Sequence, residues 1–155
     1  MQGTIVLAMT EIDEEVDKTK IEDLHTAIDK TVVSILSGEN LLKADFFGAS
    51  DPFAVIRFGG VKIGRTATIS DTLNPVWKNE SFDIHFPRST GANNMELSIE
   101  LWDEDLGGML GDFLGCVEIG VEMLLHPPSG GVTFELVNRF GWPNNLKKKK
   151  RITGR

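Results

Sequence analysis

The feature that most constrains the fold is a series of strand-length apolar segments with alternating polar positions from Thr31 onward. They are rich in β-branched residues and are separated by clusters of Gly, Pro, Asn and Asp. These segments are TVVSILSG, DPFAVIRF, VKIGRTATIS, SFDIHF, MELSIELW, FLGCVEI and VTFELV, and TIVLAM precedes them near the N-terminus. Such spacing is typical of sandwiches. The sequence therefore predicts an all-β, eight-stranded antiparallel β-sandwich.

Between the N-terminal strand and the main series, apolar residues recur at helical spacing. Residues four or eight positions apart on this stripe are Ile12, Val16, Leu24 and Ile28, with Ile21 beside them. The pattern predicts a short helical connector packed on the domain surface, with a partner-binding helix as the alternative. GVEMLL predicts one further helical turn.

The expected organisation has three parts. Residues 1–30 would form an N-terminal strand and amphipathic connector, residues 31–140 the sandwich, and residues 141–155 a basic tail. Either TIVLAM or a strand beginning at ITGR could supply the last strand of the sandwich.

Composition excludes several functional classes. A net charge of −7 and a pI of about 4.9 argue against a protein that binds nucleic acid through a basic face. The single cysteine, Cys116, lies in an apolar context, which predicts a buried thiol in a reducing compartment. No apolar run is long enough for a signal sequence or a membrane span. We expect a cytoplasmic location, with any membrane contact peripheral.

Acidic residues gather beside two loops. In MELSIELWD, the alternation that points Leu97, Ile99 and Leu101 toward the core extends to Asp103, at the mouth between the sheets. If both acidic loops lie at one end, five aspartates converge: Asp45, Asp51, Asp103, Asp105 and Asp112. Such carboxylates repel one another unless a cation neutralises them. Oxygen ligands on flexible, glycine-containing loops favour Ca²⁺ over Mg²⁺.

Three motifs in this region, LLKADFFGASDPFAVI, TLNPVWKNESFDI and ELWDEDLGGMLGDFLG, resemble C2 domains in order and spacing. The resemblance extends from about Lys30 to Val137. It implies an eight-stranded sandwich that binds calcium at one end through aspartates and then docks on phospholipid headgroups.

Carried over by position, the resemblance assigns the calcium ligands. Asp45 and Asp51 match the first loop, Asp103 and Asp105 match the third loop, and the Glu104 carbonyl lies between the latter two. Asp112 matches the last ligand, but it follows Asp105 by seven residues where the family usually has six. A wider turn at Gly107 and Gly108 could absorb the extra residue. The alternative for each aspartate is an ordinary turn residue.

Five apolar residues follow the acidic positions and are predicted membrane contacts: Phe46, Phe47, Leu106, Met109 and Leu110. For Phe47 and Leu110, packing back onto the core is the alternative.

Three residues are candidate headgroup contacts. Lys62 and Arg65 lie where some C2 domains carry a lysine-rich strand, but Ala67 stands where those members have another lysine. Trp102 faces away from the core, which predicts either a packing residue or a headgroup contact. The basic run at 147–151 could only assist binding to an anionic surface.

The leading interpretation is a calcium-dependent module that targets anionic phospholipid membranes, as part of a larger signalling, trafficking or lipid-handling protein. It would be monomeric when isolated and recruited from the cytoplasm when calcium binds. The alternative is a calcium-independent module that contacts a protein partner and has a vestigial cation site. Catalysis is not expected, because the three histidines, His25, His85 and His126, lie outside the acidic loops and form no nucleophile arrangement.

Overall fold

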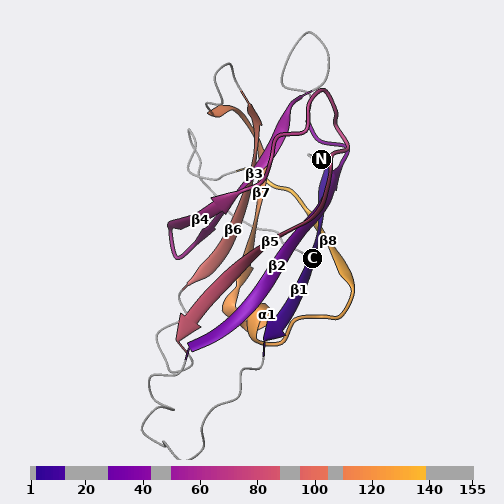
Figure 1. The fold of residues 1–155 in the computed structure, drawn as a ribbon. Coiled ribbons are helices and arrows are strands. Elements are labelled where there is room, and N and C mark those ends of the chain that lie inside the picture. The colour runs from indigo at the N-terminus through magenta and orange to yellow at the C-terminus, as the bar shows by residue number, and fades with distance from the viewer. Residues whose placement is uncertain (1–2, 13–27, 43–49, 88–94, 105–109, 139–155) are drawn as a thin grey trace, which may run out of the picture.

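The computed structural model describes residues 3–12, 28–42, 50–87, 95–104 and 110–138, which form two four-stranded antiparallel sheets (Figure 1). The first sheet has the order β5-β2-β1-β8, formed by Val76–Pro87, Ile28–Glu39, Thr4–Ile12 and Gly131–Glu135. The second has the order β4-β3-β6-β7, formed by Val61–Arg65, Pro52–Phe58, Glu96–Glu104 and Leu110–Gly120. The predicted eight-stranded sandwich is confirmed.

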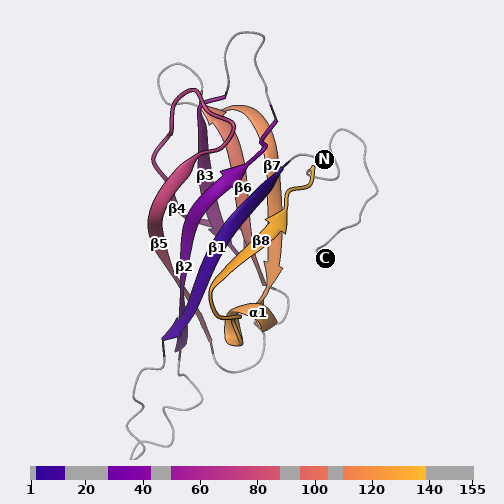
Figure 2. The same ribbon diagram turned by 90° about the vertical axis from the view of Figure 1, so that its right-hand side faces the viewer.

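The core lies between the two sheets because alternate residues of each strand point inward. Ile5 and Leu7 of β1 are fully buried, as are Leu97, Ile99 and Leu101 of β6. Figure 2 shows the two sheets as separate layers. Burial of each such side chain contributes roughly 1.5–3 kcal/mol relative to its exposure.

The N-terminal strand is an interior strand of the first sheet. β1 pairs with β2 on one side and with β8 on the other, so TIVLAM completes this sheet. The segment ITGR lies outside the described residues. The division at residues 30 and 140 stays a prediction, although β2 already begins at Ile28.

The prediction of a helical stripe from Ile12 to Ile28 is wrong at its two end residues, which lie in strands. Ile12 ends β1 and Ile28 begins β2, and their antiparallel ladder continues as far as the pair Ile12↔Lys30. Pairing between the strands satisfies backbone groups on both, and this tertiary contact overrides the helical periodicity. Residues 13–27 lie outside the described part of the chain, so a helical connector there stays a prediction.

The predicted strand over VKIGRTATIS ends early, at Arg65. Beyond it, the Thr66 N–H donates to the Ala54 carbonyl at 2.9 Å, and the Thr66 hydroxyl accepts from the Ala54 N–H at 2.9 Å. A side-chain oxygen thus takes the place of the backbone acceptor that a continued ladder would offer.

The helical turn predicted from GVEMLL is confirmed as α1, Val121–Leu125. The buried Thr31 hydroxyl donates to the Leu124 carbonyl at 2.7 Å and ties α1 to β2. No helix in the described segments is long and apolar enough to cross a membrane.

Candidate functional site

The end of the sandwich where β6 ends and where β3 and β7 begin brings the acidic segments together. The β3–β6 register pairs Pro52 with Asp103, and the β6–β7 register pairs Glu104 with Leu110. Of the six predicted ligands, Asp51, Asp103, Glu104 and Asp112 belong to the described part of the chain; Asp45 and Asp105 lie outside it.

Asp103 and Asp51 are in direct contact although 52 residues separate them in sequence. The Asp51 N–H donates to the Asp103 carboxylate (Oδ1) at 2.8 Å, and the Glu104 N–H donates to the Asp51 carbonyl at 2.9 Å. Asp103 is only 4% exposed, as its place on the core side of the alternation predicted. A carboxylate at such depth is costly unless hydrogen bonds or a counter-charge compensate it.

A third segment joins this contact through Asp71, a residue that was not among the predicted ligands. The Asp71 N–H donates to the Asp51 carboxylate (Oδ1) at 2.7 Å, and the Thr72 N–H donates to the Ser50 carbonyl at 2.8 Å. Asp71 has a left-handed backbone, φ 56°, which aspartate tolerates better than most residues. Its position three residues before the Asn74-Pro75 turn is typical of a turn residue, but nothing in the sequence indicates that it contacts Asp51.

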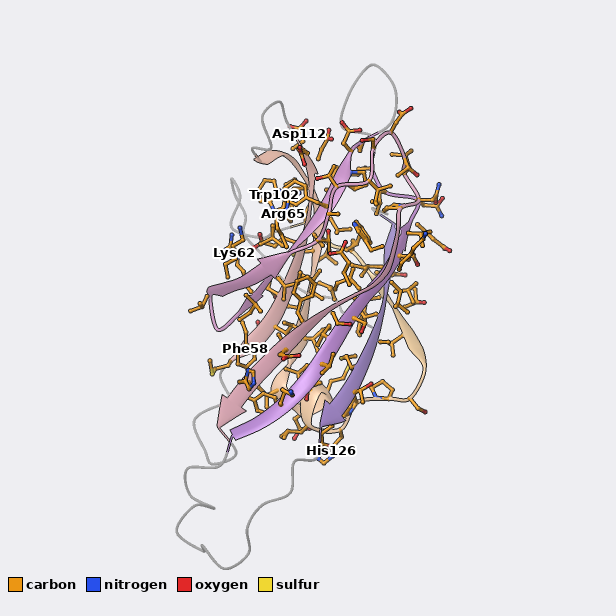
Figure 3. The ribbon with its side chains drawn as sticks, viewed as in Figure 1. Phe58, Lys62, Arg65, Trp102, Asp112 and His126 are labelled. Carbon is orange, nitrogen blue, oxygen red and sulfur yellow. The ribbon has the colours of Figure 1, made fainter. Side chains whose placement is uncertain are left out.

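Asp112 occupies a bulge in β7. Trp102 pairs with Phe113 and Glu104 pairs with Leu110, so both Gly111 and Asp112 lie opposite Asp103. A bulge of this kind redirects a side chain at the end of a strand. The Asp112 side chain is exposed and lies toward the acidic end of the sandwich in Figure 3. β7 thus contains one extra residue relative to β6 at this bulge. The wider turn predicted at Gly107 and Gly108 lies outside the described residues and stays a prediction.

The atoms at this end that could bind a metal ion are carboxylate and carbonyl oxygens, which suit a hard cation such as Ca²⁺. Within the described ranges, no group of three or more His, Cys, Asp or Glu side chains is close enough to hold a metal ion. The predicted ligand set therefore stays a prediction. What the structure supplies is the contact between Asp51 and Asp103 and a bulge that sets Asp112 opposite Asp103 in the register of β6 and β7.

Glu104 has a role for its side chain in addition to the one predicted for its carbonyl. Its carboxylate accepts hydrogen bonds from the Thr68 hydroxyl and from Arg65 Nη2, the latter at 3.3 Å. The Thr68 hydrogen bond lowers the Glu104 pKa below its ordinary value; partial burial opposes this shift, and the hydrogen bond and charge of Arg65 reinforce it. No spacing in the sequence indicated this contact, because the partners belong to different segments.

The candidate headgroup residues differ in their surroundings (Figure 3). Lys62 is exposed on β4. Arg65 is half-buried and bound to Glu104. Trp102 packs edge-on against Phe113 with ring centroids 5.3 Å apart, and its Nε1 donates to Glu100 at 3.1 Å. These contacts favour the packing interpretation of Trp102. Headgroup binding by the three residues stays a prediction.

The predicted membrane contacts fall mostly outside the described residues. Phe46, Phe47, Leu106 and Met109 lie in the ranges 43–49 and 105–109, and the backbone of Leu110 begins β7.

Three curated relatives of this chain are larger proteins. Among curated relatives, the E3 ubiquitin-protein ligase pub1 of Schizosaccharomyces pombe is 33% identical over 64% of this chain and 12% of its own length. Extended synaptotagmin-3 of Xenopus tropicalis is 30% identical over 77% of this chain and 14% of its own length. A protein of Arabidopsis thaliana named calcium-dependent lipid-binding protein is 30% identical over 79% of this chain and 22% of its own length. The chain thus spans less than a quarter of each.

Solved structures share the fold at lower identity. The C2-A domain of RIM from Drosophila superimposes with a TM-score of 0.66 and 20% identity. The match covers 88% of this chain and 99% of that chain. The corresponding C2 domain of RIM2 gives a TM-score of 0.63 and 23% identity, covering 87% and 97%. The family model described as C2 domain matches residues 29–136, which is more than half of the sequence. The chain belongs to the C2 domain family.

Proposed function

We propose that this chain is a calcium-dependent membrane-targeting module that binds anionic phospholipids and is recruited from the cytoplasm to the membrane when calcium binds. Because the chain matches only a fraction of each larger relative, we place it within a larger signalling, trafficking or lipid-handling protein. In this proposal the chain itself is a binding module and not an enzyme.

The observation that supports this function best is the contact between Asp51 and Asp103. It joins two segments that the C2 resemblance marks as calcium-binding, and one of the two residues, Asp103, is buried. Carboxylates that converge on one cation site repel one another, by roughly 3 kcal/mol for a pair about 5 Å apart at an effective dielectric near 20. A bound divalent cation would remove this repulsion, and Asp45, Asp105 and Asp112 would complete its oxygen ligands.

The charge of the chain gives calcium a second role. At −7, the free domain is repelled by an anionic bilayer. Calcium at the acidic end would reverse the sign locally and bridge to phosphate or carboxylate headgroups. The names of two relatives, extended synaptotagmin-3 and calcium-dependent lipid-binding protein, are consistent with this class of function.

Calorimetric titration of the chain with calcium tests the cation site directly. We expect saturable binding that Asp103→Asn abolishes. Asp83→Asn is the matched control, because Asp83 is an exposed aspartate in β5 whose ion-pair partner is Lys30 at 3.9 Å. It removes the same charge without touching the contact between Asp51 and Asp103.

Vesicle sedimentation tests the membrane role. Binding to vesicles that contain phosphatidylserine should require calcium and should disappear with a chelator, and vesicles of phosphatidylcholine alone should bind little in either condition. Equal binding with and without chelator, together with no calorimetric signal, would favour the alternative module that contacts a protein partner.

A further inference from the structure

Beneath the acidic end, Arg65 joins four segments through a group of side chains that we call the Arg65 network: Arg65, Phe53, Thr68 and Glu104. The Arg65 guanidinium carbon (Cζ) lies 3.7 Å from the Phe53 ring centroid. Arg65 Nε donates to the Thr66 carbonyl at 3.0 Å, and Nη2 donates to the Thr68 hydroxyl at 2.6 Å and to Glu104 at 3.3 Å. The network thus connects β4, β3, β6 and the segment that follows β4.

Two of its members, Phe53 and Glu104, lie close in sequence to Asp51 and Asp103. Phe53 follows Asp51 by two residues, and Glu104 directly follows Asp103. A planar guanidinium that stacks on a ring and donates in fixed directions restricts the groups around it more than an ammonium does. The side chains of Arg65 and Glu104 are 32% and 28% exposed, so their charge pairing alone contributes little to stability. Their contribution is therefore geometric.

We propose that Arg65 is a positioning residue for the calcium site, which holds the Asp51 and Asp103 segments at the spacing that the cation requires. The inference rests on the proposed function and adds to it a residue that sets the calcium affinity without contacting the ion. Replacement of a residue that orients metal ligands without touching the metal typically lowers metal affinity by roughly 10- to 100-fold.

The sign of the effect separates positioning from simple electrostatics. Arg65 is a positive charge near a site for a positive ion, so its neutralisation should strengthen calcium binding if charge alone matters. If Arg65 positions the ligands, the same substitution should weaken binding. Thr68→Val gives a second test, because it removes the hydroxyl that links Arg65 to Glu104 and leaves the net charge unchanged.

Arg57→Gln is the matched control. Arg57 is 33% exposed and lies 3.3 Å from Glu100, much as Arg65 lies beside Glu104, but its partner Glu100 is outside the network. Because Glu100 is buried, loss of Arg57 removes the counter-charge of a buried carboxylate and should lower the melting temperature at least as much as loss of Arg65. Any effect of lost stability on calcium binding would therefore appear in the control.

The experiment is calorimetric calcium titration of the full chain and its variants, with melting temperatures measured in chelator. We expect the calcium Kd to rise about tenfold in Arg65→Gln and several-fold in Thr68→Val, to recover partly in Arg65→Lys, and to stay unchanged in Arg57→Gln. If Arg65→Gln does not fold, the calcium Kd of Thr68→Val tests the inference.

Three results would overturn the inference. An unchanged or lower Kd in both network variants would show that Arg65 does not position the ligands. An equal rise in Arg57→Gln would assign the effect to lost stability. Absence of calcium binding by the unaltered chain would overturn the proposed function and this inference together, and so is distinct from the first two results.

Discussion

The single residue Asp103 is both buried and hydrogen-bonded to Asp51. Its place on the inward side of β6 buries it, and its carboxylate receives the Asp51 N–H at 2.8 Å. A hydrogen bond from an uncharged donor compensates only part of the cost of burying a carboxylate. The same side chain therefore joins the end of β6 to the residue that precedes β3 and remains suited to a cation.

Asparagine and alanine at position 103 should differ in the absence of calcium. Asp103→Asn keeps an oxygen that can accept the Asp51 N–H and removes a repelling charge, so the free energy of unfolding should stay the same or rise. Asp103→Ala leaves that N–H without its acceptor and should lower the free energy of unfolding by about 1–3 kcal/mol. Urea denaturation in chelator measures both. Equal losses in the two variants would contradict the role of the hydrogen bond.

The sequence predicted the burial of Asp103 but not its neighbours. Strand alternation alone places Asp103 on the core side. The contacts of Arg65 with Phe53, Thr68 and Glu104 depend on the registers of β3 with β4 and with β6. No pattern along a single segment specifies those registers, so the Arg65 network could not be predicted.

At the scale of elements, irregularities in the strands shape the acidic end. β7 contains an extra residue between the pairs Glu104↔Leu110 and Trp102↔Phe113, and another before the pair Leu101↔Gly115. Strand alternation predicts where a strand runs, but it does not predict an extra residue. The eight expected strands were therefore found, although the one over VKIGRTATIS ends early, at Arg65. The bulge at Asp112 became visible only from the pairing with β6.

A similar irregularity in β5 allows a stability test. Ile35 pairs with Glu80 and Ser37 with Val76, so β5 has more residues than β2 between these pairs, and Lys78 there has φ 57°. A left-handed conformation costs a residue with a side chain roughly 1–2 kcal/mol, which exceeds the entropic cost of glycine, about 0.5–1 kcal/mol. Lys78→Gly should therefore raise the free energy of unfolding by about 0.5–1 kcal/mol.

Lys62→Gly is the control for that substitution. Lys62 is also exposed and also in a strand, but φ is not positive there, so glycine should only destabilise. Urea denaturation of both variants compares the two positions. A loss of stability in Lys78→Gly equal to that in Lys62→Gly would contradict the strain argument.

For the whole molecule, calcium should act as a stabilising ligand. The proposed calcium site would be assembled only in the folded state, so binding to the native chain should shift the folding equilibrium, by about 2.7 kcal/mol when free calcium is about 100 times Kd. Differential scanning calorimetry should show a melting temperature that rises with calcium and responds less to magnesium, which demands a tighter octahedral site. An identical melting curve at millimolar calcium and in chelator would exclude the cation site.

The last prediction concerns the apolar residues beside the acids. Replacement of Phe46, Leu106 and Met109 together by Ala should leave the calorimetric calcium Kd unchanged, because none of them supplies an oxygen ligand. Membrane affinity should fall at least tenfold, since burial of one such side chain contributes roughly 1.5–3 kcal/mol and about 1.4 kcal/mol corresponds to a tenfold change. Val61→Ala is the control: Val61 is 65% exposed but pairs with Phe58, at the end of β3 away from Asp51.

Salt separates the two contributions to membrane binding. A bridge between calcium and headgroups weakens as ionic strength rises, whereas inserted apolar side chains do not. Vesicle sedimentation in calcium should therefore show salt-resistant binding for the unaltered chain and for Val61→Ala, and salt-sensitive binding for the triple variant. If the triple variant binds as tightly as the unaltered chain at every salt concentration, those three side chains do not enter the membrane, and the charge bridge alone accounts for the attachment.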